Sequence, residues 1–170
     1  MESIRNNPII VIEGLDGVGK TTLVNSLELV LDAVVIKTPG VISISGESRP
    51  LRELYDSQCE SIRRAYYRFA CVTAGIQARE FSETVPVIID RYWTSTVSYA
   101  AGAGEDKQTM SFLGKYPDDI IKPDLVIVLT VNEAVRLTRI RKRQDIDSVE
   151  ESRLASDTVF RERIMNALRS

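Results

Sequence analysis

A glycine-rich segment near the N-terminus has the residue types that bind phosphate groups. Residues 14–21, Gly-Leu-Asp-Gly-Val-Gly-Lys-Thr, match the pattern G-x-x-x-x-G-K-[ST] in full. The glycines allow the backbone to turn its N–H groups inward, and a helix that follows would favour anions at its N-terminus. In such a loop Lys20 reaches the β- and γ-phosphates of a nucleotide, and Thr21 holds Mg²⁺. The residues expected to bind the nucleotide are Gly14, Asp16, Gly17, Val18, Gly19, Lys20, Thr21 and Thr22.

A second candidate is the pair Asp90-Arg91, which follows the apolar run 85–89. A carboxylate at the end of a strand beside a phosphate-binding loop can hold the water shell of Mg²⁺. The guanidinium of Arg91 can clamp a phosphate through two parallel hydrogen bonds, which a lysine cannot do. The alternative is an aspartate that caps a helix and pairs with the arginine.

A basic cluster and an aromatic cluster complete the candidates. Arg139 and Arg143 lie four residues apart and share one helical face, where they could cover the charge that develops in phosphoryl transfer. A solvated basic helix end is the alternative. Tyr66 and Tyr67 could stack on a base or pack in the core. Further members of the two clusters are Arg63, Arg64, Arg68, Phe69, Arg136, Arg141 and Lys142.

The elements that must position these residues form an alternating pattern of apolar runs and helix-length segments. The pattern predicts an α/β fold whose parallel sheet is covered by helices on both faces. Each candidate follows a strand, so the candidates should meet at the carboxyl edge of the sheet. The run before residues 14–21 reads as a strand and the run after them as a helix, which argues against a chance glycine-rich turn. The expected strands are 8–13, 33–37, 85–90 and 124–131, and the expected helices are 20–31, 52–59, 60–82, 94–101, 132–143 with Asn132 as N-cap, and 150–168.

Composition narrows the class of protein. The chain has 170 residues, enough for one domain with its own core. A net charge of −2 gives no electrostatic reason to expect a nucleic-acid polymer as partner. The chain has no histidine, so histidine can serve neither as a catalytic base nor as a metal ligand. No run reaches membrane-spanning length and the N-terminus has no apolar leader. We therefore expect a cytoplasmic protein with no membrane partner.

With these motifs in place, the chain resembles the thymidylate kinase family of nucleoside monophosphate kinases over about residues 8–165. Residues 11–22 resemble the family's phosphate loop, and 37–40 (Lys-Thr-Pro-Gly) resemble the loop after its second strand. Residues 90–96 resemble its D-R-[YFH]-x-x-S segment, and 122–129 its K-P-D-L strand. The run Val-Ile-Ile-Asp-Arg-Tyr-Trp at 87–93 is closest to the UMP/CMP kinase branch, which is usually found in mitochondria.

This resemblance implies a three-layer P-loop kinase fold, a single domain over residues 1–170 and a lid around 139–150. It implies transfer of the γ-phosphoryl group of ATP, with Mg²⁺, to a pyrimidine nucleoside monophosphate: CMP, UMP, dCMP or dTMP. Asp16 would contact the acceptor sugar, Arg91 the acceptor phosphate and the lid arginines the transferred group. A homodimer is a further expectation to test. The implied catalytic residues are Lys20, Arg91, Arg139 and Arg143; the substrate-binding residues are Asp16, Lys37, Arg91, Tyr66 and Tyr67; the metal ligands are Thr21 and Asp90.

The chain departs from the family pattern at three places. Val72 stands where thymidylate kinases usually carry an arginine that reads the pyrimidine, and Lys37 stands where many members have arginine. The family's fifth strand, adenine-packing loop and last helix have no counterpart before Ser170, so we expect a sheet without that C-terminal strand and helix and weak selection for adenine.

Two other functions stay open at this point. A deoxynucleoside kinase needs a carboxylate base near the acceptor, usually after the second strand, where this chain has no acid until Glu47. A degenerate nucleotide-binding protein without catalysis is the second alternative. A regulatory GTPase is disfavoured because the sequence has no N-K-x-D segment.

Overall fold

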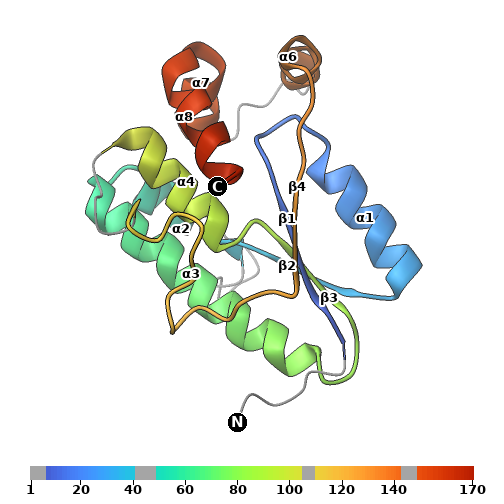
Figure 1. Cartoon of the computed structure of the whole chain (residues 1–170). Helices are drawn as coiled ribbons and strands as arrows, with labels where there is room; N and C mark the ends of the chain where they lie inside the picture. Colours follow the sequence, from blue (N-terminus) through green and yellow to red (C-terminus); the bar gives the residue numbers. More distant parts are fainter. Residues whose placement is uncertain (1–6, 41–48, 105–109, 143–148) are drawn as a thin grey trace.

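The computed structural model describes residues 7–40, 49–104, 110–142 and 149–170. Within them, four parallel strands form one sheet in the order β2-β3-β1-β4, so that β1 lies in the interior of the sheet between β3 and β4 (Figure 1). The strands are β1 (Ile9–Glu13), β2 (Val34–Lys37), β3 (Val87–Asp90) and β4 (Leu125–Val128). The helices are α1 (Lys20–Leu31), α2 (Arg49–Asp56), α3 (Glu60–Phe81), α4 (Trp93–Ala103), α6 (Glu133–Lys142), α7 (Val149–Ser156) and α8 (Thr158–Leu168).

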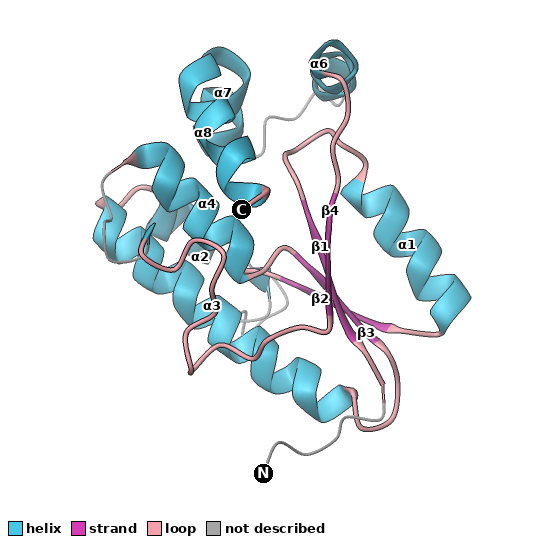
Figure 2. Cartoon of the chain, in the orientation of Figure 1, coloured by secondary structure: helices cyan, strands magenta, loops and turns pink. Residues whose placement is uncertain are grey.

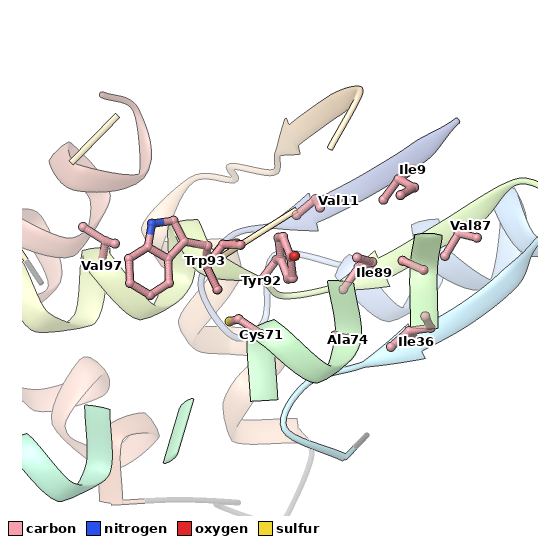
Figure 3. Close-up of a cluster of buried hydrophobic side chains, with 12 residues drawn as sticks. Ile9, Val11, Ile36, Cys71, Ala74, Val87, Ile89, Tyr92, Trp93 and Val97 are labelled. Carbon is pink, nitrogen blue, oxygen red and sulfur yellow. The ribbon is translucent and has the colours of Figure 1, made fainter. Parts of the chain in front are cut away.

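The alternation of side chains along β1 builds the three layers that the sequence predicts. All five residues of β1 are buried, and successive side chains point to opposite faces of the sheet. Ile10 and Ile12 pack with Val24 of α1 on one face. Ile9 and Val11 pack on the other face against α3, where the close-up in Figure 3 shows them with the neighbouring core residues. Figure 2 shows α1 on one side of the strands and α3 and α4 on the other.

A second core joins the C-terminal helix to the phosphate loop. Leu15, Phe160 and Ile164 belong to one buried cluster that connects residues 14–21 with α4 and α8. Gly102 lets the two helices approach closely, because a Cβ at this position would lie 2.6 Å from Cγ1 of Ile164. The helix α8 is therefore packed against α4, which begins two residues after Arg91.

Most predicted elements are confirmed, and the last helix is the main correction. The segment 150–168 forms two helices, because Asp157 interrupts it and its Oδ1 accepts a hydrogen bond from the N–H of Phe160 at 2.9 Å, capping α8. The helix expected at 52–59 runs over Arg49–Asp56, and β4 ends at Val128, three residues earlier than predicted. The predicted cap of α6 is confirmed, since Asn132 Oδ1 accepts from the N–H of Ala134 at 2.9 Å. Among the described helices, none has the length and apolarity to cross a membrane.

Candidate phosphate-binding site at the sheet edge

The loop between β1 and α1 has the conformation that its glycines predict. Gly14 has φ +137° and sits so close to the residue that follows β4 that a Cβ would meet the carbonyl oxygen of Leu129 at 2.6 Å. Gly17 has φ +85° and packs directly on the backbone of Arg136. Left-handed backbone of this kind strains any residue with a side chain. Glycine at these two positions is therefore required by the path of the loop.

The ammonium group of Lys20 lies inside this loop. Its Nζ donates to the carbonyl oxygens of Gly14 and Leu15, at 2.9 Å in both cases. The side chain is 9% exposed, and Nζ lies 3.6 Å from Oδ1 of Asp16. Burial, followed by the charge of Arg91, lowers the pKa of Lys20 to about 8. A lysine held in this way is well placed to bind an anion that enters the loop, since an anion would favour its charged form.

Asp16 joins the phosphate loop to the third strand. Its Oδ1 accepts a hydrogen bond from Nη2 of Arg91 at 2.5 Å. Burial would raise the pKa of Asp16, but the charges of Arg91 and Lys20 outweigh it and hold that pKa well below its ordinary value. Burial would lower the pKa of Arg91, but the charge of Asp16 outweighs burial and holds that pKa above its ordinary value. Both partners are therefore ionised throughout the physiological range.

Arg91 is held by two backbone hydrogen bonds and by contacts of its side chain. Its φ of +66° is unusual for a residue with a side chain. Its N–H donates to the carbonyl of Ile12 at 3.0 Å, and its carbonyl accepts from Oγ1 of Thr38 at 2.8 Å. The guanidinium also lies 5.8 Å from the ring centre of Tyr99 and donates to Oγ of Ser95 at 3.4 Å. An unfavourable backbone angle that several contacts keep in place is typical of functional positions.

Glu13 is a buried carboxylate that the sequence analysis missed. Its Oε1 accepts from the N–H of Tyr92 at 2.9 Å and of Ser95 at 3.0 Å, and Oε2 accepts from the Ser95 hydroxyl. These bonds satisfy the first turn of α4, so Glu13 acts as a cap supplied by another strand. Burial raises its pKa above the ordinary value, against the effect of these bonds and of Arg91. The only available signal was an acidic residue at the end of an apolar strand.

The predicted residues that meet here line a cavity of about 290 Å³. Lys20, Lys37 and Arg91 face it together with Arg52 of α2, which the sequence analysis did not select. With Asp16 and Asp90 as the acidic members, the lining carries four cationic and two anionic side chains, which suits a phosphate. The lining residues are Asp16, Gly17, Lys20, Thr21, Lys37, Thr38, Pro39, Gly40, Arg52, Asp90 and Arg91.

The two predicted metal ligands fit a magnesium ion. Oδ1 of Asp90 is buried and has no hydrogen-bond partner among the residues that the structure describes. Thr21 lines the same cavity at the start of α1. The described part of the chain has no group of three or more His, Cys, Asp or Glu that could hold a metal by itself. Mg²⁺ commonly takes one or two carboxylates together with substrate phosphates, so these two side chains match its needs.

Tyr66 and Tyr67 are not among the residues that line the cavity; both contact α2. The ring of Tyr66 stacks on that of Tyr55 with centroids 4.4 Å apart, and the hydroxyl of Tyr67 donates to Oδ1 of Asp56 at 2.8 Å. Asp56 also pairs with Arg52 at 3.4 Å. The tyrosines thus anchor the helix that carries Arg52 to the cavity, which agrees with the core-packing alternative. Their stacking on a base stays a prediction.

The basic cluster on α6 contains one buried arginine, Arg136, and an exposed arginine, Arg139, that also contacts the phosphate loop. Arg136 is 1% exposed, and its Nη1 donates to the carbonyl of Asp16 at 3.0 Å. Arg139 Nη1 donates to the carbonyls of Gly17 and Val18, at 3.3 and 3.0 Å. Both arginines therefore contact the phosphate loop. Arg141 and Lys142 are exposed, while Arg143 lies outside the described residues, as do 144–148 of the predicted lid.

Comparison with known proteins points to one family. A family model described as thymidylate kinase matches residues 12–170. The human protein named UMP-CMP kinase 2, mitochondrial, is 36% identical over 162 residues, which cover 92% of this chain and 35% of the relative. The chain thus spans about a third of that relative's length. A thymidylate kinase of Francisella philomiragia is 31% identical over 160 residues, covering 86% of this chain and 77% of the relative.

Solved structures show the same fold at lower identity. Thymidylate kinase from Candida albicans has a TM-score of 0.69 at 21% identity, covering 96% of this chain and 76% of its own. Deoxyadenosine kinase from M. mycoides has a TM-score of 0.63 at 20% identity, covering 95% of this chain and 81% of its own. The three-layer P-loop kinase architecture predicted from the sequence is therefore confirmed.

Proposed function

Because the chain belongs to the thymidylate kinase family, we propose that it transfers the γ-phosphoryl group of ATP to a pyrimidine nucleoside monophosphate. The observation that carries the proposal is that cations from separate elements line one cavity. Lys20 comes from the phosphate loop, Lys37 and Arg91 from the ends of β2 and β3, and Arg52 from α2. A donor phosphate and an acceptor phosphate can each have cationic partners there. Phosphoryl transfer depends mainly on such positioning and charge stabilisation.

In this mechanism each residue binds or orients a phosphate. Lys20 neutralises charge on the transferred group, and Arg91 holds the acceptor phosphate. Oδ1 of Asp90 and the Thr21 hydroxyl would hold Mg²⁺, which when bound shields the negative charge between the phosphates. Arg139 would exchange its carbonyl partners in the loop for oxygens of the transferred group. The assignment of Arg143 and of a lid around 139–150 belongs to the same proposal.

The state of Asp16 supports a monophosphate as acceptor and not a nucleoside. A nucleoside hydroxyl needs a base that takes its proton. Asp16 is the carboxylate beside Arg91, and its lowered pKa makes it a weak base. A nucleoside monophosphate presents oxygens that are already ionised and needs no such base. A deoxynucleoside kinase is therefore the second candidate, although the deoxyadenosine kinase from M. mycoides has the same fold.

Within the pyrimidine monophosphates, we place CMP, UMP and their deoxy forms ahead of dTMP. Val72 occupies the position at which the family usually has a base-reading arginine, and it packs against the core on α3. A hydrogen bond to a base edge discriminates strongly, so its loss should loosen selection for thymine. The name of the human relative supports the same order, because it gives UMP and CMP as substrates.

The test is a coupled ADP-release assay with Mg²⁺-ATP across CMP, UMP, dCMP, dTMP and the matching nucleosides. We expect turnover with the first three monophosphates and none with the nucleosides. Lys20→Ala is the matched control and should lower turnover by on the order of 10³ or more while the fold is kept. A strong preference for dTMP would overturn the substrate order, and turnover of a nucleoside would favour the deoxynucleoside kinase. Nucleotide binding without turnover would favour a degenerate relative.

We also propose that two copies of the chain associate through α3. Ile62, Phe69 and Ile76 are seven residues apart in sequence and therefore share one face of this helix. Their exposed fractions are 45%, 59% and 59%, which is unusual for an aligned row of large apolar side chains. Ile62 and Ile76 are equidistant from Phe69, so two antiparallel copies about a twofold axis would match isoleucine with isoleucine.

We also propose that the protein is located in the cytoplasm. Mitochondria are the alternative, because the name of the human relative places that protein there. Cell fractionation of the native protein would decide between the two.

A further inference from the structure

Arg136 is the most buried charged side chain of the α6 cluster, and it reaches three separate segments of the chain. Its Nε and Nη2 donate to the two carboxylate oxygens of Glu133, at 2.8 Å each. Nη1 donates to the carbonyl of Asp16 at 3.0 Å, and Nη2 also lies 3.4 Å from the carbonyl of Leu154 on α7. The planar guanidinium can serve such a set only in one orientation.

The contact with the phosphate loop is tight on the backbone side as well. A Cβ at Gly17 would lie 3.0 Å from the carbonyl oxygen of Arg136 and 3.2 Å from its Cγ. The loop is therefore seated directly on α6 at this residue. A shift of the Arg136 side chain would therefore disturb the loop at residues 16 and 17.

Asp16 connects Arg136 to the candidate phosphate site. Its main chain is held by Arg136, and its carboxylate is held by Arg91. The orientation of the Arg91 guanidinium toward the cavity thus depends on where Arg136 keeps the backbone of Asp16. Hydrogen bonds from Arg136, with a smaller contribution from its charge, keep the pKa of Glu133 below the ordinary value, so the carboxylate that orients Arg136 stays ionised.

We propose that Arg136 is a positioning residue that sets the acceptor phosphate site by fixing the main chain of Asp16 against α6 and α7. It does not contact the reacting groups; it acts through Asp16 on Arg91. The inference rests on the proposed function for its kinetic consequence. Its physical content, a phosphate loop held in place by one buried guanidinium, can be tested without turnover.

Arg161 is a matched control inside the same network. Its Nε lies 3.2 Å from Glu133, and its Nη1 donates to the carbonyl of Leu154 at 2.9 Å. The contacts of Arg161 thus include two of the partners of Arg136, but they do not include Asp16 in the described structure. A purely structural role predicts equal consequences for Arg136→Lys and Arg161→Lys. A positioning role predicts that only the first reaches the phosphate loop.

The experiment measures hydrogen exchange and steady-state kinetics for Arg136→Lys, Arg161→Lys and Glu133→Gln. Arg136→Lys should speed amide exchange in the peptide that contains residues 14–20 by about tenfold and raise the acceptor KM by a similar factor, with kcat within about twofold. Arg161→Lys should leave both readouts unchanged. Glu133→Gln, which loosens the guanidinium without truncating it, should shift exchange and acceptor KM in the same direction by a smaller factor.

Equal exchange in the phosphate-loop peptide of Arg136→Lys and the unchanged chain would overturn the proposal, as would equal effects of the two arginine variants. If Arg136→Lys does not fold, the amide exchange rates of the phosphate-loop peptide in Glu133→Gln and in Arg161→Lys are compared instead, and this comparison decides the question. Absence of turnover in the unchanged chain would contradict the proposed function, while the exchange comparison would still confirm or overturn the role of Arg136.

Discussion

Asp16 and Arg91 are 75 residues apart in the chain, yet Oδ1 of the first accepts a hydrogen bond from Nη2 of the second at 2.5 Å. The pair joins the loop after β1 to the end of β3, two strands that lie side by side in the sheet. Nη2 of Arg91 is thereby bound to Asp16, and Nη1 donates to Oγ of Ser95 at 3.4 Å. Arg91 also lines the cavity, where its charge can attract an incoming phosphate.

Replacement of Arg91 by lysine should weaken acceptor binding selectively. Arg91→Lys keeps the charge but loses the planar fork that contacts Asp16 and a phosphate together. We expect the acceptor KM to rise by about tenfold or more and the KM for ATP to change by less than about twofold. Initial rates with each substrate varied in turn would measure both constants, with the exposed Arg141→Lys as control. Equal increases in the two constants would show that Arg91 does not belong to the acceptor side.

The lowered pKa of Lys20 predicts a pH dependence for ATP capture. The free enzyme should lose the cationic form of Lys20 as the pH rises through about 8, so kcat/KM for ATP should fall above that pH. Bound phosphates favour the charged form, so binding near pH 8.5 should take up most of one proton. Calorimetry in two buffers of different ionisation enthalpy measures this uptake. Lys20→Arg stays charged and should take up none; uptake by that variant, or none by the unchanged chain, would contradict the assignment.

Removal of the Glu13 carboxylate should destabilise the fold. Glu13→Ala leaves the N–H groups of Tyr92 and Ser95 buried without their acceptor, and should lower the free energy of unfolding by about 3 kcal/mol. Glu13→Gln keeps one acceptor oxygen and should cost about 1 kcal/mol. Urea unfolding would measure both, with the exposed Glu28→Ala as control. A Glu13→Ala variant as stable as that control would rule out the capping role.

The apolar row on α3 predicts the oligomeric state. Phe69→Glu places a charge at its centre, where burial against a second copy would be costly, and should convert a dimer into a monomer. Leu29→Glu changes an apolar residue of α1 that is 84% exposed and should leave the dimer intact. Light scattering after size exclusion would give the masses. A monomer for the unchanged chain, or loss of the dimer in both variants, would count against α3 as the interface.

The sequence predicted the elements that local patterns determine. The bounds of α1, Lys20–Leu31, follow from the glycine loop before it and the helix-forming run within it. The break at Asp157 could not be predicted, because a polar residue in an amphipathic pattern reads equally as an exposed helical position and as a cap. Here the choice depends on how α8 packs against α4 through Gly102.

The site was predictable to the extent that its residues follow strands. Asp16, Lys37 and Arg91 meet because the carboxyl ends of parallel strands share an edge. The distinction between Arg136 and its neighbours on α6 was beyond the pattern, since its burial is created by contacts with Asp16 and Leu154, which lie far from it in sequence. Arg52 was missed for a similar reason: aromatic contacts between α2 and α3 bring it to the cavity.

Main-chain oxygens hold the ammonium of Lys20, and this has a consequence for how such a protein can diverge. The carbonyls of Gly14 and Leu15 are acceptors whatever side chain the second residue carries. The side chains of Leu15 and Val18 face the buried cluster with α8 and are constrained by packing alone. Apolar substitutions at Leu15 and Val18 can therefore accumulate together with changes in α8 without altering the electrostatics of the phosphate site. Stability and chemistry can evolve here on nearly separate sets of atoms within the same eight residues.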